Sequence, residues 1–154
     1  MVAAPGLTVI DTPIFVIDLR YRRDRNFAAN RAFLDRIAKG YPGATTIFNL
    51  LEVCGILSFN LGKRQLAELF HYFPRHYSVE VLPHSTLESA LPTFRAADLF
   101  DKIATKASFG DAQIASAVEP MFPVQFGLFP GTRASFKNRL SISVLTPREF
   151  IQSV

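Results

Sequence analysis

The sequence predicts an α/β domain with a mostly parallel central sheet, because short strand-like runs alternate with helix-like segments along the whole chain. The chain has 154 residues, of which 49% are hydrophobic and 19% are charged. This length and composition fit one globular domain and exclude a largely disordered chain. A core of this size forms without metal or disulfides, so any metal would serve a function.

The amino-terminal half contains the clearest alternation. A β-rich run at 7–10 ends at Asp11, and the apolar segment 14–17 suits either a continuing strand or a new helix. Residues 26–39 have apolar positions at helical spacing, and Gly40 and Pro42 follow as helix-ending residues. The next predicted elements are a strand at 44–48, a buried helix at 49–59, a helix at 63–73 that Pro74 stops, and a strand at 79–82.

The carboxyl-terminal half carries helix-start signals. Ser85-Thr86-Leu87-Glu88 matches a capping box and predicts a helix that breaks at Pro92 and restarts to about Thr105. Ser108 resembles the same signal. The remaining predicted elements are a helix at 112–119, strands at 124–129 and 140–145, and a terminal helical turn capped by Thr146-Pro147-Arg148-Glu149.

Charge and cysteine content narrow the functional classes. The net charge is +4 and twelve of the seventeen basic residues are arginine, whose planar guanidinium suits phosphate, so a nucleic-acid partner is permitted. The single cysteine, Cys54, excludes an intrachain disulfide and favours a reducing compartment. The sequence has neither an 18-residue apolar run nor a secretory leader, so we expect a cytoplasmic protein with no membrane partner.

Three acidic residues stand where the pattern calls for apolar ones. Asp11 directly follows an apolar strand. The neighbours of Glu52 at three and four residues' distance on its predicted helix are Phe48, Asn49, Gly55 and Ile56, which leaves the carboxylate little solvated surface. Asp111 occupies a position on the apolar stripe of its helix. Each of these acids needs a partner, because burying an unpaired carboxylate costs several kcal/mol.

Each acid has an ordinary explanation when it is taken alone. Asp111 could belong to a capping box, and Glu52 could pair with an arginine. Taken together, acids from a strand end and from two helices that flank one sheet could converge on a hard divalent cation, which prefers carboxylate oxygens and water.

The surrounding residues also resemble the PIN domain, a small metal-dependent nuclease family. The resemblance rests on Ile10-Asp11-Thr12, Asn49-Leu50-Leu51-Glu52-Val53 and Phe109-Gly110-Asp111-Ala112-Gln113-Ile114-Ala115, in the order and approximate spacing of that family. The ending Val144-Leu145-Thr146-Pro147-Arg148-Glu149-Phe150 is also similar. The resemblance covers one domain, residues 1–154, with a core of about 7–151.

The resemblance implies a three-layer α/β/α fold with four to five strands, and an Mg²⁺- or Mn²⁺-dependent ribonuclease. It also implies similarity to the toxins of toxin–antitoxin pairs, with an antitoxin partner and a homodimer. It assigns Asp11, Glu52 and Asp111 as metal ligands and catalytic residues. Thr132 replaces the fourth acidic position and at best holds a metal-bound water, and Pro13 is a second departure from the family pattern.

Basic residues near these motifs are candidate RNA contacts. Arg22 and Arg23 lie in a run of arginines, and Arg133 and Lys137 follow Thr132. A charged run is also compatible with a simple solvated surface. Two functions therefore remain open: a metal-dependent ribonuclease, and a PIN-like module that binds RNA or a protein without cleaving it.

Overall fold

The computed structural model of the chain describes residues 6–120, 128–129 and 145–153. Four parallel strands are found in this part of the chain: β1 (Thr8–Ile10), β2 (Gly43–Thr46), β3 (Glu80–Leu82) and the two-residue β4 (Leu128–Phe129). The helices are α1 (Thr12–Arg20), α2 (Phe27–Ala38), α3 (Ile47–Leu57), α4 (Lys63–Tyr77), α5 (Ala96–Ala104), α6 (Phe109–Val118) and α7 (Pro147–Ser153).

The sheet has the order β3-β2-β1-β4, and each neighbouring pair is parallel. Thr8 pairs with Gly43, and Thr46 pairs with Leu82. Because all strands run the same way, the ends of β1, β2 and β3 meet at one edge, which we call the carboxyl edge. The predicted α/β class with a parallel sheet is confirmed.

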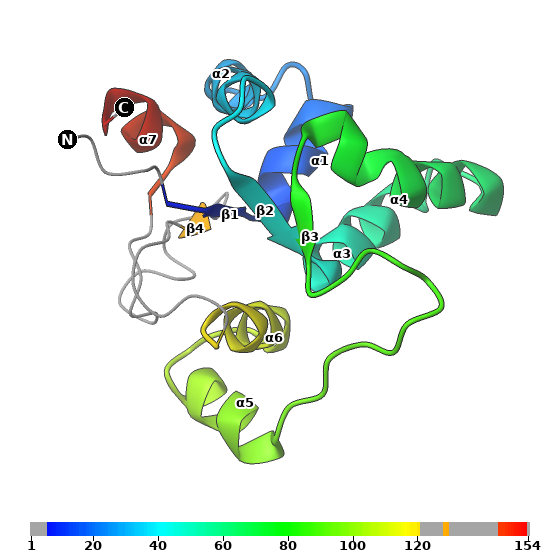
Figure 1. The fold of residues 1–154 in the computed structure, drawn as a ribbon, viewed down its shortest axis with the longest axis vertical. Coiled ribbons are helices and arrows are strands. Elements are labelled where there is room, and N and C mark those ends of the chain that lie inside the picture. Colours follow the sequence, from blue (N-terminus) through cyan, green and yellow to red (C-terminus); the bar gives the residue numbers. More distant parts are fainter. Residues whose placement is uncertain (1–5, 121–127, 130–144, 154) are drawn as a thin grey trace.

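Helices cover the sheet and bury a core that is rich in aromatic side chains. In Figure 1, α2 lies above the sheet while α5 and α6 lie below it. Phe15, Phe73 and Tyr77 are buried, and the Phe15 ring lies 4.7 Å from that of Phe73 and 4.9 Å from that of Tyr77. This aromatic cluster fixes α1 against α4 and thereby positions the start of α1 at the carboxyl edge.

Most predicted elements of the amino-terminal half are confirmed, with boundaries that differ by one to four residues. The segment 14–17, which suited two structures, belongs to helix α1. The strand predicted at 44–48 ends at Thr46, because the Thr46 hydroxyl caps α3 and the helix begins at Ile47.

The prediction that Pro74 stops its helix is wrong. Helix α4 continues through Pro74 to Tyr77 and ends at Ser78, whose φ is 55°. Proline in the last turn removes one backbone hydrogen bond, and the buried Phe73 and Tyr77 rings on either side of it keep the turn packed on the core.

The helix start predicted at the Ser85–Glu88 capping box is also wrong, whereas the predicted restart after Pro92 to about Thr105 is confirmed by α5. The first helix after β3 is α5, which begins at Ala96. The Thr86 hydroxyl instead donates to the Glu88 carboxylate within a turn, and Pro83 and Pro92 border the segment. A cap without an apolar face behind it does not form a helix in this segment.

Ser108 caps α6 as predicted, but the helix begins at Phe109 and not at residue 112. Thr146 caps α7 through reciprocal hydrogen bonds with Glu149. The strand predicted at 124–129 is described only at residues 128–129, and nearly all of the strand predicted at 140–145 lies outside the described residues. Among residues 6–120, 128–129 and 145–153, each helix is too short or too polar to span a bilayer.

Candidate functional site

Asp11 links the end of β1 to the start of α1. Its Oδ1 accepts a hydrogen bond from the backbone N of Thr12 at 2.9 Å, and the side chain caps α1. A carboxylate is stabilised at this position by the partial positive charge of the helix N-terminus. The residue is only 7% exposed, which confirms the prediction that Asp11 lies at the edge of the core.

A chain of hydrogen bonds runs from Asp11 to Glu52. The Asn49 side-chain amide Nδ2 donates to Asp11 Oδ1 at 3.0 Å and to Thr12 Oγ1 at 3.0 Å. The Thr12 hydroxyl in turn donates to Glu52 Oε2 at 2.6 Å. We call these four residues the Asp11 network, and they tie the first turn of α1 to the first two turns of α3.

The local fold holds Asn49 in its place within the network. Asn49 Oδ1 accepts from the backbone N of Thr46 at 3.2 Å, and Asn49 N donates to Thr46 Oγ1 at 3.1 Å, and these two bonds form a capping box at the start of α3. The neighbouring Thr45 hydroxyl donates to the carbonyl oxygen of Ile10 at 2.8 Å. These bonds join the ends of β1 and β2, so the network sits on the rigid edge of the sheet.

Glu52 is exposed, and the expectation that it has little solvated surface is wrong. Leu51 and Gly55 are exposed beside it, while Phe48 and Ile56 are only half-buried, so α3 has a solvent-facing stripe. Gly55 contributes no side chain that could cover the carboxylate. Glu52 makes no ion pair with any residue of the described ranges, so a structural arginine partner is not its role there.

Asp111 lies in the first turn of α6. Its backbone N donates to the Ser108 Oγ at 3.1 Å, so one half of the expected capping box is present. The carboxylate is half-buried and makes no hydrogen bond or ion pair with another described residue. Its neighbours Gly110 and Gln113 line a cavity of about 220 Å³ together with Glu52, so the start of α6 faces α3 at this point.

Asp11 and Glu52 are therefore linked through Thr12 and Asn49, whereas Asp111 belongs neither to this network nor to the described lining of the cavity beside Glu52. Within residues 6–120, 128–129 and 145–153, no three His, Cys, Asp or Glu side chains lie close enough to form a metal-binding group. The expected gathering of three carboxylates is thus not assembled in this part of the structure.

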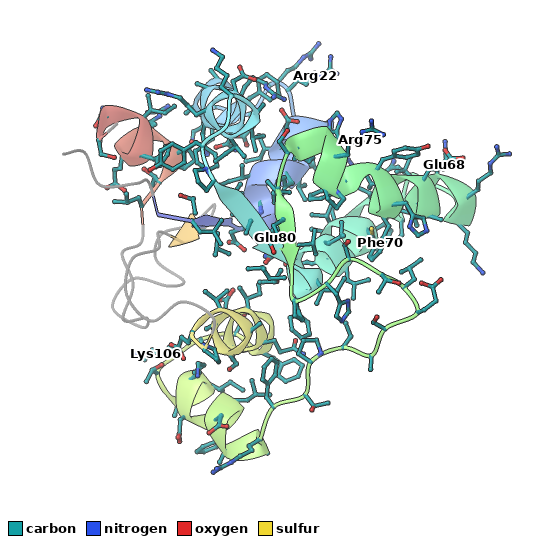
Figure 2. All side chains as sticks on the ribbon, viewed as in Figure 1. Arg22, Glu68, Phe70, Arg75, Glu80 and Lys106 are labelled. Carbon is teal, nitrogen blue, oxygen red and sulfur yellow. The ribbon has the colours of Figure 1, made fainter. Side chains whose placement is uncertain are left out.

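The predicted RNA contacts are divided between two regions. Arg22 and Arg23 are exposed in the turn after α1, at the opposite end of that nine-residue helix from Asp11, about 13 Å along its axis. Figure 2 shows Arg22 beside α2, on the far side of the molecule from α6. The other candidates, Thr132, Arg133 and Lys137, lie outside the described residues.

Sequence reasoning missed two residues of the site. Thr12 is 2% exposed and Asn49 is fully buried, and both connect the carboxylates. Asn49 is a polar residue within an apolar run, so the argument that singled out the three acids also applied to it. The spacing Thr46-x-x-Asn49 was a second signal, since it matches a helix cap.

Together these side chains can hold a cation or a water at the carboxyl edge, since the network presents carboxylate oxygens of defined orientation. Comparison of the chain with family models, with curated proteins and with solved structures finds no match. A function for the Asp11 network therefore has to be argued from its own residues.

Proposed function

We propose that this chain is a PIN-like ribonuclease that hydrolyses RNA phosphodiester bonds with Mg²⁺ or Mn²⁺ at the Asp11 network. The observation that carries the proposal is the hydrogen-bonded path from Asp11 to Glu52 at the carboxyl edge of a parallel sheet. Ligands of open α/β sheets bind outside this edge. The proposal includes the three-layer α/β/α arrangement with four to five strands that the resemblance implies.

The donor set fits a hard cation in its chemistry. Mg²⁺ binds through one or two carboxylates and keeps several waters, so Asp11 with Glu52 meets the minimum requirement. Asp111, half-buried and without a described partner, supplies a third carboxylate from the α6 side. A bound cation would lower the pKa of a water and neutralise charge on the phosphate.

The other residues of the network position these carboxylates. Asn49 and the Thr12 backbone both donate to Asp11 Oδ1, which fixes the orientation of that carboxylate. Thr12 holds Glu52 by its hydroxyl, and Glu52 is exposed enough to orient an attacking water. In this proposal the Thr132 hydroxyl hydrogen-bonds a water that is bound to the metal.

The proposed function is tested by RNA cleavage. A mixed pool of single-stranded RNA is incubated with the protein and Mn²⁺, with and without a chelator, beside the Asp11→Asn and Asp111→Asn variants. Glu80→Gln is the matched control, because Glu80 is an exposed acid at the amino end of β3, away from the carboxyl edge. Figure 2 labels Glu80 on β3.

We expect cleavage that needs Mn²⁺, is at least about 100-fold slower in both aspartate variants, and is unchanged in Glu80→Gln. Cleavage that continues with the chelator, or that neither aspartate substitution slows, would refute the nuclease proposal.

A second candidate function is a PIN-like module that binds RNA or a protein without cleaving it. The observation that favours it is the lack of a three-residue metal-binding group among the described residues. RNA binding without cleavage in the same assay supports this candidate. Cleavage gained by Thr132→Asp would further indicate that the fourth acidic position limits activity.

The biological context in the proposal is that of a toxin restrained by an antitoxin protein and active as a homodimer. Tyr72, Phe100 and Phe109 are large exposed apolar side chains at 65%, 67% and 62%, available to such protein contacts. Light scattering of the purified chain tests the dimer, and co-expression with the product of a neighbouring gene tests the antitoxin.

A further inference from the structure

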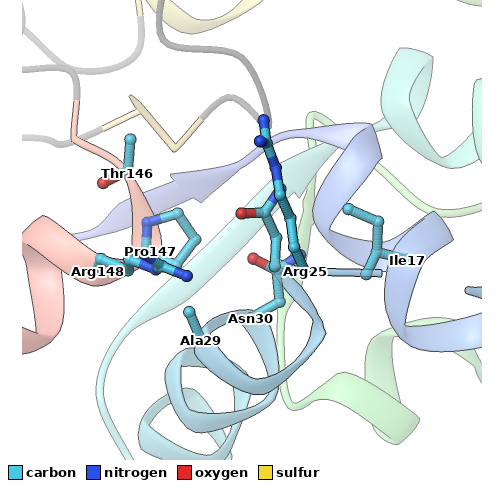
Figure 3. Close-up of a pocket in the computed structure, with 8 residues that line it drawn as sticks. Ile17, Arg25, Ala29, Asn30, Thr146, Pro147 and Arg148 are labelled. Carbon is cyan, nitrogen blue, oxygen red and sulfur yellow. The ribbon is translucent and has the colours of Figure 1, made fainter. Parts of the chain in front are cut away.

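A second pocket lies between α1, α2 and the start of α7, away from the Asp11 network. Its volume is about 300 Å³ (Figure 3). Ile17, Ala29 and Pro147 form its apolar part. The polar residues that line it are Arg25, Asn26, Asn30, Thr146 and Arg148. We call it the arginine pocket, and none of the described residues that line it is acidic.

The two arginines of this pocket make no ion pair with a described carboxylate, although two carboxylates lie at its rim: Asp24 Oδ1 accepts from Asn26 N at 2.7 Å, and Glu149 Oε2 accepts from Thr146 N at 2.8 Å. Arg25 and Arg148 are exposed, and neither forms an ion pair with a carboxylate of the described residues. Arg31 pairs with Asp18 and Asp35, and Arg64 pairs with Glu68. Arg36 and Arg75 also lack an ion pair among the described residues, but they do not line this pocket. Two guanidinium groups on one concave surface favour the binding of an anion.

Asn30 gives the pocket a buried polar wall. The residue is 3% exposed, lines the pocket, and its side-chain amide has no hydrogen-bond partner among residues 6–120, 128–129 and 145–153. In Figure 3 it lies between Pro147 and Arg25. The Asn30 amide is not among the described buried polar groups that are cut off from solvent, so it faces the pocket and can hydrogen-bond a ligand there.

The start of α2 forms one side of the arginine pocket. Asn26, Ala29 and Asn30 share one helical face, because they are spaced by three and four residues, and all three line the pocket. Asn26 is the N-cap residue, yet its side chain makes no capping bond. The Asp24 carboxylate accepts from Asn26 N at 2.7 Å and offsets part of the positive charge of the α2 N-terminus, so the two arginines supply the main attraction for an anion.

We propose that the arginine pocket binds a phosphate monoester carried on a small organic group. Two guanidinium groups match a dianionic phosphate, and the Asn30 amide adds a donor and an acceptor. The apolar side formed by Ile17, Ala29 and Pro147 accommodates the organic group. A volume of about 300 Å³ is at the small end for ligand pockets, which favours a molecule of mononucleotide size over an open polymer track.

The probe is adenosine 5′-monophosphate, titrated calorimetrically into the full chain without divalent metal. We expect saturable binding of the nucleotide and none of adenosine. Arg25→Gln and Arg148→Gln should each weaken binding by about tenfold or more. Arg36→Gln is the matched control, because Arg36 is exposed on α2, makes no described ion pair and does not line the pocket.

Asn30→Asp separates the pocket from general surface charge. The substitution keeps the shape of the side chain and places a carboxylate where the phosphate would bind, so binding should be lost. A thermal melt without ligand checks that this variant is folded. Nucleotide binding that survives Asn30→Asp in a folded protein, or that Arg36→Gln weakens as much as Arg148→Gln, would contradict the proposal.

A further arm identifies the source of the monoester. Short RNA with a 5′-phosphate is compared with the same RNA carrying a 5′-hydroxyl. Preference for the phosphorylated end, or binding of the free nucleotide, supports the monoester, whereas equal binding of both RNAs without nucleotide binding would overturn it. Asp11→Asn should bind the nucleotide as the unmodified chain does, so this result is independent of the nuclease proposal.

Discussion

Thr12 is the central residue of the Asp11 network, because its hydroxyl accepts a hydrogen bond from Asn49 and donates one to Glu52. Thr12→Val keeps the shape and removes the hydroxyl, which leaves one buried Asn49 donor bond unmade. We expect the free energy of unfolding to fall by about 1–2 kcal/mol, measured by urea denaturation.

Thr8→Val is the matched control for this change. Thr8 is also a buried threonine, 3% exposed on β1, but its hydroxyl makes no hydrogen bond with a described residue. Its substitution should leave stability unchanged or raise it. Equal losses in the two variants would mean that the network hydrogen bonds do not stabilise the fold.

Tyr77 forms a second polar contact in the core. Its hydroxyl donates to Asp18 Oδ2 at 2.9 Å, and Arg31 pairs with the other oxygen of Asp18 at 2.8 Å. Burial, together with the negative charge of Asp18, raises the pKa of Tyr77 well above its usual value. The phenol therefore stays protonated in the folded protein at pH values where it ionises in the unfolded chain.

This raised pKa has a consequence for stability at high pH. A group whose pKa is raised on folding stabilises fully below its unfolded pKa, about 10 for tyrosine, and loses that contribution as pH increases further. We expect the free energy of unfolding to fall above about pH 10, and to fall less steeply in Tyr77→Phe. Denaturation at pH 8 to 11 measures this, with the exposed Tyr72→Phe as control.

If the two tyrosine variants show the same slope with pH, the Tyr77–Asp18 contact is not the cause. At neutral pH Tyr77→Phe should cost about 1–2 kcal/mol, because it removes a hydrogen bond to a carboxylate.

At the scale of elements, the approach of α2 to β2 depends on Gly43. A Cβ atom at Gly43 would lie 2.6 Å from Cγ2 of Ile37, a side chain that is 1% exposed and cannot move into solvent. Gly43→Ala should therefore reduce the free energy of unfolding by about 1–3 kcal/mol, as measured by chemical denaturation.

Gly55→Ala provides the comparison, because a Cβ at Gly55 meets no atom within 4 Å and the residue lies inside α3. Alanine favours the helix, so this variant should gain about 0.5–1 kcal/mol. A stable Gly43→Ala would show that the packing of Ile37 against β2 is loose.

The sequence pattern correctly predicted helices with a clear helical spacing of apolar residues. It failed where contacts with distant parts of the chain determine the local structure. Residues 26–39 matched α2 to within one residue at each end, whereas 14–17 fit two structures until the buried Phe15 ring placed it in α1. Two local signals were overridden by the tertiary structure. Helix α4 continues through Pro74, and no helix forms at the capping box that begins at Ser85.

The site was partly predictable, because some of its residues are placed by the local sequence pattern and others by tertiary packing. Asp11 at the end of a buried strand followed from the pattern alone. The exposure of Glu52 depends on which side of α3 packs against the core. The run 49–59 is apolar on nearly all sides and does not determine this side. The position of Asp111 relative to the other two acids depends on how α6 packs beside α3. These two helices are far apart in the chain, so the local sequence does not determine their packing.

At the scale of the whole molecule, α1 connects two sites of opposite charge. Its first turn carries Asp11 and the carboxyl edge, and its last turns lead to Ile17 and the arginine pocket. The proposed nuclease site and the proposed phosphate-binding pocket would thus lie toward opposite ends of α1. The nuclease account depends on the acidic face binding a cation.

Binding of Mn²⁺, followed by the loss of the free-ion signal in electron paramagnetic resonance, tests this central claim most directly. We predict saturable Mn²⁺ binding by the unmodified chain that Asp11→Asn weakens at least about tenfold and that Glu80→Gln leaves unchanged. Absence of Mn²⁺ binding, or equal binding by the Asp11→Asn variant, would contradict a metal site at the Asp11 network.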